Sequence, residues 1–184
     1  MTISEPERER ALVALREHHV AGSLTLEDFA DRVGIALRGD IATALRDLPA
    51  PSRRKPTRFV PALFSSTRRD GRMRIRRRIL CLVACGNIDL DLRQASLEGD
   101  VVTVIGFAVC SALDVYVPEG VEVDLHGLGI FGHKNARGKD VPPLPGTPLI
   151  RVYTLGVCAG IDVWRTSERG SIREVIRTQR ELDK

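Results

Sequence analysis

Hydrophobic and polar residues alternate along most of the chain beyond residue 78, and this two-residue period predicts β-strands. The clearest runs are VVTVIG at 101–106, VEVDLH at 121–126 and LIRVYTLG at 149–156, with segments rich in Gly, Pro and Asp between them. In the first fifty residues the apolar positions recur every three or four residues instead, which is typical of helices. The pattern therefore predicts a mainly β protein with a small helical unit at its N-terminus.

Three short helices are expected in residues 1–50. Ser4 and Glu7 have the spacing of a capping box, and Thr25 with Asp28 marks a second helix start. A third short helix is expected near the end of this unit. Because so small a unit has a marginal core, we expect it to dock on another surface.

One eight-residue pattern recurs in the second half of the chain. ACGNIDLD begins at residue 84, VCSALDVY at 109 and VCAGIDVW at 157, so the intervals are 25 and 48 residues. A further copy is therefore expected near the middle of the longer interval, where IFGHKN at 130–135 fits with Phe in the place of Cys. The equivalent positions form one row: Cys85, Cys110, Phe131 and Cys158.

Short strands that repeat about every 24 residues predict a solenoid, in which each coil covers the apolar face of its neighbour. The expected fold is a right-handed parallel β-helix of about four coils, preceded by the three-helix unit and followed by a C-terminal helix. A β-sandwich is the alternative. The expected boundaries are 1–50 for the helical unit, 51–71 for a basic Pro-rich linker, 72–168 for the β-helix and 169–184 for the terminal helix.

The row of cysteines and phenylalanine is interpreted as an interior packing site, because a free cysteine behaves as a small apolar side chain. With coils stacked in chain order, Phe131 would lie between Cys110 and Cys158. A redox-linked pair of Cys85 and Cys110 and a metal site are the alternatives. The aspartates of the three copies would form a ladder on the outer face, either solvated or holding calcium weakly: Asp89, Asp114 and Asp162.

Basic residues are concentrated in one segment. Residues 53–78 carry eleven Lys or Arg and a single acid, Asp70, whereas the segments on either side are mildly acidic. If RMRIRRR at 72–78 is extended, its even-numbered arginines share one face, while Met73, Ile75 and Arg77 share the other. Such a block protects a sheet edge, or it binds an anionic membrane surface, nucleic-acid phosphates or an acidic protein. The candidate residues for anionic-surface binding are Arg53, Arg54, Lys55, Arg68, Arg69, Arg72, Arg74, Arg76 and Arg78.

No catalytic constellation is found in the sequence. His126 and His133 have no nucleophile motif beside them, and the glycines form no phosphate loop because no helix with a Lys follows them. His18 and His19 point about 100° apart on a helix, so we interpret them as a surface pair rather than a metal chelate. We therefore expect no catalytic residue, no metal and no cofactor, and a protein that is not an enzyme.

The composition also bears on the location of the protein. The N-terminus MTISEPERER lacks the apolar core of a signal peptide, and no apolar run has the length of a membrane span. We expect a cytoplasmic protein, peripheral at the inner face of the membrane, with its four cysteines reduced. Aromatic residues make up 4% of the chain, so a base-stacking surface is not expected.

The run ERERALVALREHHVAGSLTLEDFADRVGIALRGDIATALRDLP resembles the short SHOCT-like helical domain of actinobacterial proteins. The resemblance rests on the leading E-R-E-R, the G-x-L-T-L-x-D-F centre and the closing L-x-D-L-P. That family has no established chemistry. The resemblance therefore implies an accessory docking or oligomerisation unit rather than an active site.

The run VYVPEGVEVDLHGLGIFGHKN is similar to the LiaF-type C-terminal domain of bacterial cell-envelope stress proteins, also called the toast-rack domain. VPEGV at 117–121 and FG at 131–132 match the motifs of that family directly. GNIDLDLR at 86–93 and AGIDVW at 159–164 match its repeat without the Phe. Over residues 79–166 the resemblance implies a parallel β-helix that senses or scaffolds at the cell envelope.

The expected function is a non-enzymatic interaction or scaffold module in cell-envelope stress sensing, with its basic segment on an anionic surface. The expected partners are a membrane-associated signalling protein or a second copy of the chain, together with an anionic membrane. The alternative is a nucleic-acid-binding transcriptional regulator that uses the helical unit and the arginine block.

Overall fold

The computed structural model describes residues 5–50, 55–138 and 141–166, in which the helices precede the strands. The helices are α1 (Glu5–Val20), α2 (Leu26–Leu37) and α3 (Ile41–Ala44). The strands are β1 (Thr57–Leu63), β2 (Ser66–Arg69), β3 (Arg74–Ala84), β4 (Asn87–Asp91), β5 (Ser96–Leu97), β6 (Val101–Val109), β7 (Ala112–Val117), β8 (Glu122–Ile130), β9 (His133–Arg137), β10 (Leu149–Val157) and β11 (Gly160–Arg165). The protein is therefore mainly β with a small N-terminal helical unit, as predicted. The helix expected at 169–184 lies outside the described residues.

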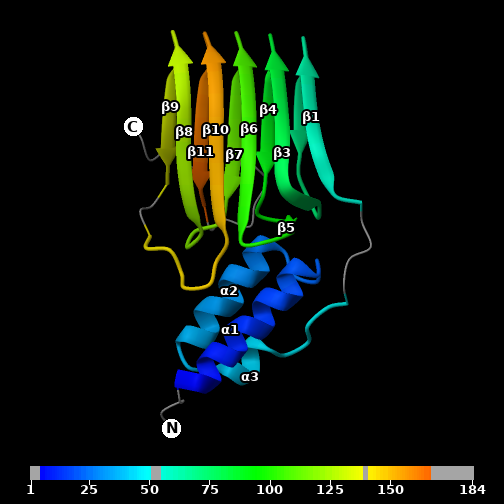
Figure 1. The fold of residues 1–184 in the computed structure, drawn as a ribbon, viewed down its shortest axis with the longest axis vertical. Coiled ribbons are helices and arrows are strands. Elements are labelled where there is room, and N and C mark those ends of the chain that lie inside the picture. The colour runs from blue at the N-terminus through cyan, green and yellow to red at the C-terminus, as the bar shows by residue number, and fades with distance from the viewer. Residues whose placement is uncertain (1–4, 51–54, 139–140, 167–184) are drawn as a thin grey trace.

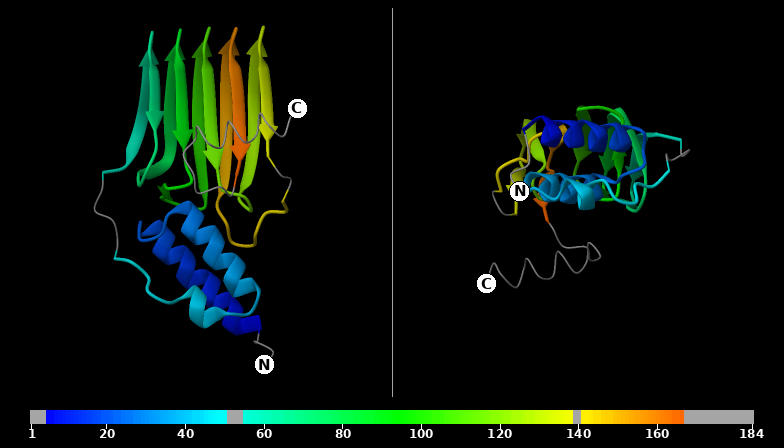
Figure 2. Two further views of the ribbon diagram at one scale, coloured as in Figure 1. Left: turned by 180° about the vertical axis from the view of Figure 1, so that it is seen from behind. Right: turned by 90° about the horizontal axis from the view of Figure 1, so that it is seen from below.

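The described strands form two sheets in which neighbouring strands are parallel. Sheet A has the order β1-β3-β6-β10-β8, with the short β5 beside β3, and sheet B has the order β2-β4-β7-β11-β9. The sheets lie face to face, and the helical unit lies at one end of them (Figures 1 and 2). Each long strand of sheet A leads through a tight turn into a strand of sheet B. This alternation is compatible with a solenoid-like fold.

The order of the strands differs from the expected stacking in chain order. β10 and β11 lie between the β6–β7 and β8–β9 pairs, so the last two strand pairs exchange places. β10 pairs along its whole length with β6 on one side and with β8 on the other. The prediction that Phe131 separates Cys110 from Cys158 is therefore wrong, because the turn of Cys158 lies between the other two.

The Pro-rich loop before β10 accounts for this exchange. In it, the Leu144 amide donates to the Gly120 carbonyl at 2.9 Å, and the Thr147 hydroxyl donates to the same carbonyl at 3.2 Å. Leu149, the first residue of β10, then donates to the carbonyl of Asp100, just before β6, at 2.7 Å. Because these bonds fix the start of β10 beside β6, the chain inserts a strand pair instead of adding one at the edge.

The linker expected at 51–71 is wrong over much of its length, because β1 and β2 form within it. Val60 and Ala62 are buried whereas Phe59 and Pro61 are exposed, which is the alternation of a strand. A proline is tolerated here because β1 is at the edge of sheet A, where one row of amides has no neighbouring strand. The prolines made this segment resemble a linker in the sequence, although it forms the edge strands β1 and β2 of the two sheets.

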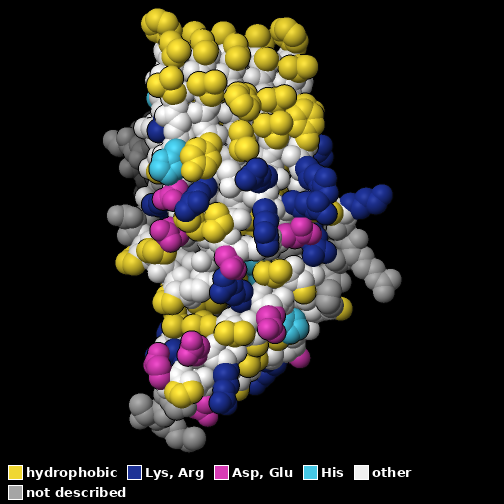
Figure 3. Space-filling view, viewed as in Figure 1, with side chains coloured by type: hydrophobic (Ala, Val, Ile, Leu, Met, Phe, Trp, Pro, Cys, Tyr) yellow, Lys and Arg dark blue, Asp and Glu magenta, His cyan; other side chains and the backbone are white. Residues whose placement is uncertain are grey.

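The repeated row lies at the turns between the sheets and not in the core. Cys85, Cys110, Phe131 and Cys158 are all exposed, and each has a left-handed backbone conformation with φ between 45° and 55°. Phe64, with φ of 50°, takes the same place in the turn from β1 to β2 and is a fifth member that the sequence search missed. The interpretation of the row as interior packing is therefore wrong. Hydrophobic side chains instead line the end of the sheets remote from the helices (Figure 3).

Close stacking of these turns explains why a small residue follows each row member. The Cys85 amide donates to the Val109 carbonyl of the adjacent turn at 3.0 Å. At the next position, a Cβ on Gly86 would collide with the carbonyl oxygen of Ser65 in the neighbouring turn. The repeated motif therefore encodes a turn whose backbone packs on its neighbours, and it does not encode a core side chain.

The main core lies between the two sheets and consists of aliphatic side chains together with Cys81. The helical unit has a smaller core around Phe29. Leu26 and Ala30 of α2 pack into the main core rather than into the helical one. The helical unit thus docks on the β domain, as expected for a unit too small to be stable alone.

The first amides of α2 donate hydrogen bonds into the loop between β4 and β5. Leu26 donates to the Ala95 carbonyl at 2.6 Å, and Glu27 donates to the Arg93 carbonyl at 2.9 Å. The first four amides of a helix have no partner within the helix, so this loop satisfies two of them. The docking site is therefore specified by backbone groups as well as by apolar contact.

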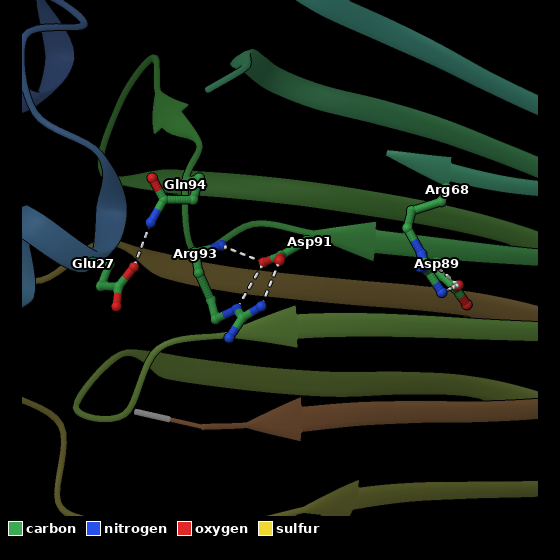
Figure 4. A network of polar contacts seen from close by, with 6 residues as sticks. All are labelled: Glu27, Arg68, Asp89, Asp91, Arg93 and Gln94. Carbon is green, nitrogen blue, oxygen red and sulfur yellow. Dashed lines mark hydrogen bonds and ion pairs between the residues drawn. The ribbon is translucent and has the colours of Figure 1, made fainter. Parts of the chain in front are cut away.

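A buried ion pair holds this loop in place. Arg93 donates through Nη2 to Asp91 at 2.7 Å and through Nε at 3.0 Å, and both side chains are almost fully buried. Gln94, next in the loop, donates to the carboxylate of Glu27 at the start of α2 (Figure 4). Removal of one member of such a pair would leave a buried charge without its partner, which is strongly destabilising.

His19 belongs to the interface between the helical unit and the β domain, so its assignment to the surface is wrong. Its side chain is 2% exposed and stacks on Phe29 with ring centroids 5.0 Å apart. Nε2 accepts from the Leu97 amide at 3.3 Å, so Nδ1 carries the proton and donates to the Leu24 carbonyl at 3.1 Å. Burial lowers the pKa of His19 from 6.5 to about 4, because the charged ring would lose its hydration.

The stability of the protein is expected to fall in mild acid because of His19. Below pH 6.5 the unfolded chain binds a proton that the folded chain does not bind until about pH 4. The free energy of unfolding should therefore decrease by about 1.4 kcal/mol per pH unit over this range, on the order of 3 kcal/mol in all. Urea unfolding of wild type and of His19→Gln, which can make both hydrogen bonds without titrating, measures this difference. A constant difference between the two proteins from pH 7 to pH 4 would contradict it.

Cys85 and Cys81 are expected to respond in opposite ways to a polar substitution. Cys85→Asn should leave the free energy of unfolding unchanged or raise it by up to about 1 kcal/mol, because Asn tolerates a left-handed conformation. Cys81 is fully buried, so Cys81→Ser should lower it by about 1–3 kcal/mol. Urea unfolding of both variants at pH 7 is the measurement. Similar losses in the two variants would restore the core interpretation of Cys85.

Candidate anion-binding site

The basic segment forms part of sheet A beside the helical unit. Arg58 lies on the edge strand β1, and the arginines from Arg74 to Arg78 lie on its neighbour β3. Lys and Arg side chains gather on this side of the molecule, between the hydrophobic end of the sheets and the helices (Figure 3). The pairing of β1 with β3 fixes the backbone positions of these arginines, which a flexible linker would not do.

A bulge in β3 turns three consecutive arginines outward. Thr57 of β1 pairs with Ile75, but Phe59 pairs with Leu80, so β3 has three extra residues between these points. Residues 76–78 are all exposed as a result. The prediction that Arg77 shares the buried face of Ile75 is therefore wrong, because the bulge interrupts the alternation of the strand.

These arginines surround an open hollow of about 740 Å³ on the surface. We call it the arginine hollow, and its lining among the described residues is Val20, Arg58, Arg74, Arg76, Arg77, Arg78 and Glu98. Val20 is the last residue of α1, so the hollow lies where the helical unit meets β1 and β3.

Glu98 is the only acid in that lining. One of its carboxylate oxygens lies 3.0 Å from Arg74 Nε and the other lies 3.5 Å from Arg76 Nε, which are ion-pair distances. Within the described part of the chain, Arg58, Arg77 and Arg78 have no ion pair. Five guanidinium groups therefore face one carboxylate, and the hollow carries a net positive charge.

The arrangement is suited to binding phosphate or another oxyanion. A guanidinium group is planar and donates paired hydrogen bonds to such anions, and it stays charged at any physiological pH. The polar side chains in the described lining are arginines and Glu98, which is paired with Arg74. These guanidinium groups are suited to binding an anion.

Arg68, a candidate from the sequence, is used within the protein. Its Nε and Nη2 donate to Asp89 Oδ2 at 3.1 and 2.9 Å, and this hydrogen bond raises the pKa of Arg68 (Figure 4). The pair lies on sheet B and not on the sheet that carries the hollow. The structure therefore does not bring Arg68 into the site.

The other candidates lie apart from the hollow. Lys55 and Arg69 are exposed before β1 and at the end of β2. Arg72 lines a separate pocket of about 190 Å³ at the docking interface. Arg53 and Arg54 lie outside the described residues. Of the nine sequence candidates, the structure places Arg74, Arg76 and Arg78 together.

Sequence reasoning missed Arg58 and Arg77, which complete the hollow. Arg58 was not among the predicted site residues because its segment, which contains Pro56 and Pro61, was interpreted as a linker. Arg77 was excluded by strict alternation, which the bulge breaks. The density of arginines between 72 and 78 was a signal for Arg77, whereas Arg58 could be assigned to the hollow only from the pairing of β1 with β3.

The aspartates of the repeat form the predicted ladder on the outer face of sheet B. Asp114 pairs in register with Asp89 on one side and with Asp162 on the other. Burial raises the pKa of Asp114, the hydrogen bond from Trp164 at 2.9 Å opposes this, and the two neighbouring carboxylates raise the pKa further. Asp162 accepts from Arg137 at 3.0 Å. The ladder is thus compensated by side chains on both of its sides.

The described residues include no group of three or more His, Cys, Asp or Glu placed to hold a metal ion. His126 stacks on Tyr153 with ring centroids 5.3 Å apart. His133 Nε2 lies 3.2 Å from a carboxylate oxygen of Asp162. Both histidines therefore make surface contacts with neighbouring strands.

The fold and the site together define a mainly β protein with a positively charged hollow and a small helical domain docked beside it. The family model described as DUF1707 SHOCT-like domain matches residues 1–49, so the N-terminal unit is SHOCT-like, as its motifs predicted. No curated protein and no solved structure matched the chain in the comparisons. None of the helices in the described ranges has the length and apolar character needed to cross a membrane.

Proposed function

We propose that this protein is a non-enzymatic interaction module that attaches to an anionic membrane surface through the arginine hollow. The observation that carries the proposal is the gathering of five guanidinium groups around a single carboxylate on a sheet surface. A basic side chain near an anionic membrane contributes about 1 kcal/mol, so several of them acting together give a useful affinity. The backbone pairing of β1 with β3 holds them in place before binding, which reduces the entropy lost on attachment.

The proposed setting is the cell envelope, with the protein peripheral at the inner face of the membrane. The support is the similarity of residues 79–166 to the LiaF-type domain, which implies sensing or scaffolding and a parallel β-helix; the right-handed form is expected from the repeat of about 24 residues. The parallel sheets and the alternation of the chain between them agree with that architecture, although the last two strand pairs are exchanged. In this proposal the two sheets are a rigid platform and the SHOCT-like unit closes one end of it.

A protein partner is proposed for the helical unit. Its inner side is occupied by the β domain, so a signalling protein or a second copy would bind the outer side, formed by α1 and α3. An open groove between Arg10 of α1 and Leu45 after α3 lies on that side. This proposal rests on the groove, since the SHOCT-like family match names neither a role nor a partner.

Nucleic acid is the second candidate for the hollow, because guanidinium groups also bind its phosphates. The specific observation in its favour is the absence of acids other than Glu98 from the described lining. A duplex titration at low salt would separate the two functions. Binding that falls steeply with salt and exceeds binding to vesicles would favour nucleic acid.

Vesicle flotation tests the membrane function directly. Wild type should float with vesicles of phosphatidylcholine and phosphatidylglycerol and not with phosphatidylcholine alone. The triple variant Arg58→Gln, Arg77→Gln, Arg78→Gln removes about 3 kcal/mol of attraction and should bind about 100-fold more weakly. Glu98→Gln should bind more tightly than wild type, because it removes the acid from the hollow.

Arg68→Gln is the matched control for this experiment. It removes one positive charge from sheet B, as each of the single variants Arg58→Gln, Arg77→Gln and Arg78→Gln removes one from the hollow. Because Arg68 is paired with Asp89, its loss should leave vesicle binding nearly unchanged. Equal recovery of wild type from neutral and anionic vesicles would overturn the proposed function. So would equal weakening by Arg68→Gln and by each single substitution in the hollow.

A further inference from the structure

The outer face of sheet A exposes large hydrophobic side chains in successive rows near the turns. The row next to the turns contains Leu63, Val109, Val157 and Ile130 on four of its five strands. Two residues further along, the register aligns Phe107, Leu155 and Leu128. Leu63 is 65% exposed and Leu128 is 62% exposed, so these side chains stand in solvent. We call these rows, together with the turn residues Phe64 and Phe131, the apolar face.

Phe64 and Phe131 mark its two corners. They occupy equivalent turns on opposite edges of the sheets, and they are 82% and 85% exposed. The cysteine turns lie between them, so the whole end of the sheets is apolar (Figure 3). Five strands and about five residues along each give a patch of roughly 20 by 15 Å. This is the scale of the largest apolar patches on monomeric proteins, which mark interaction sites.

The apolar face is confined to one side of the molecule. The outward positions of sheet B at the same level carry polar residues such as Ser66, Asn87 and His133, followed by the aspartate ladder. Sheet B would lose hydration if it were buried in an apolar medium. A partner of the apolar face must therefore contact sheet A and leave sheet B in water.

Polarity changes in a definite order along the strands of sheet A. Beyond the apolar rows, the next row is mixed and consists of Phe59, Leu80, Ile105, Tyr153 and His126. The row after it contains Arg78, Thr103, Arg151 and Asp124, and Arg151 lies 3.6 Å from Asp124. Tyrosine and histidine have an apolar ring and a polar tip, which suits them to the boundary between an apolar medium and water. Arginines follow where phosphates would lie. This order matches the acyl, interfacial and headgroup layers of a bilayer.

A second copy of the chain would satisfy only part of this surface. If it packed through its own apolar face, it would cover the apolar rows, but that face is bordered by the same arginines, which do not attract each other. An anionic bilayer supplies acyl chains for the apolar rows and phosphates for the arginines at once. Charge complementarity therefore favours lipid as the occupant.

We propose that the apolar face of sheet A inserts into the boundary between headgroups and acyl chains of the membrane that the arginine hollow binds. This inference rests on the proposed function and adds a second, salt-resistant component to it. The domain is tilted, so that the strands of sheet A enter the bilayer with the turns first, Phe64 and Phe131 lie deepest and sheet B faces the water. Interfacial elements of this kind bury their apolar side chains about 5–10 Å below the surface.

Quenching of tryptophan by brominated lipid tests the insertion. Trp164 is the single tryptophan of the chain and lies on sheet B, so wild type should show little quenching in anionic vesicles. Phe131→Trp places a second indole on the apolar face, and its emission should be strongly quenched. Equal, weak quenching in both proteins while both still float would overturn the insertion and leave the proposed function intact.

Binding in high salt gives the second readout. Phe64→Asn with Phe131→Asn suits the left-handed backbone at both turns, so the protein should fold normally. At about 0.5 M NaCl, where electrostatic attraction is screened, this double variant should bind vesicles about tenfold more weakly than wild type. Val13→Asn, which removes an exposed valine on α1 far from the sheets, is the matched control and should bind as wild type does.

The outcomes separate the two proposals. Quenching with neutral and anionic vesicles alike would support insertion and overturn the electrostatic function. Failure to float with either vesicle would overturn both. A dimer in sedimentation that the Phe64→Asn, Phe131→Asn variant abolishes would overturn insertion in favour of a second copy as the occupant.

Discussion

The stacking of equivalent turns is the constraint on which the rest of the structure depends. In each turn one residue takes a left-handed conformation, and in the turns of Phe64, Cys85, Cys110 and Cys158 its amide donates to the carbonyl at the end of the adjacent strand of sheet A. Because the turns are superposed, all strands on either side are in register, and side chains of one kind align across the sheets. The apolar face, the aspartate ladder and the buried rows between the sheets are consequences of this one alignment.

The two ends of the sheets are closed in different ways. At the end away from the helices, the turns themselves close the structure and expose hydrophobic side chains. At the other end, α2 directs its first amides at a loop that the buried pair of Asp91 and Arg93 holds rigid. The neutral ring of His19 completes that contact. The helical unit therefore gains its stability from the β domain, and in return it covers the core at that end.

The position of the arginine hollow follows from the same geometry. It lies where the edge of sheet A, the end of α1 and the loop with Glu98 meet, next to the apolar rows. A charged and an apolar surface thus lie side by side on one sheet, while the outer face of the opposite sheet carries small and polar residues in the same region. This one-sided arrangement is the physical basis for orienting the molecule at an interface.

The local patterns of the sequence were sufficient to determine the helical unit, the alternating strands and the repeat at 85, 110, 131 and 158. They also determined the aspartate ladder, because residues at one place in a repeat align when strands are parallel. The sequence did not determine whether the repeated row lay inside or outside the sheets. A Cys or Phe followed by a small side chain is compatible both with a left-handed turn residue and with a buried residue. The tertiary structure also decided the exchange of β10 with β8 and the bulge that exposes Arg77, because both depend on hydrogen bonds between segments far apart in the chain.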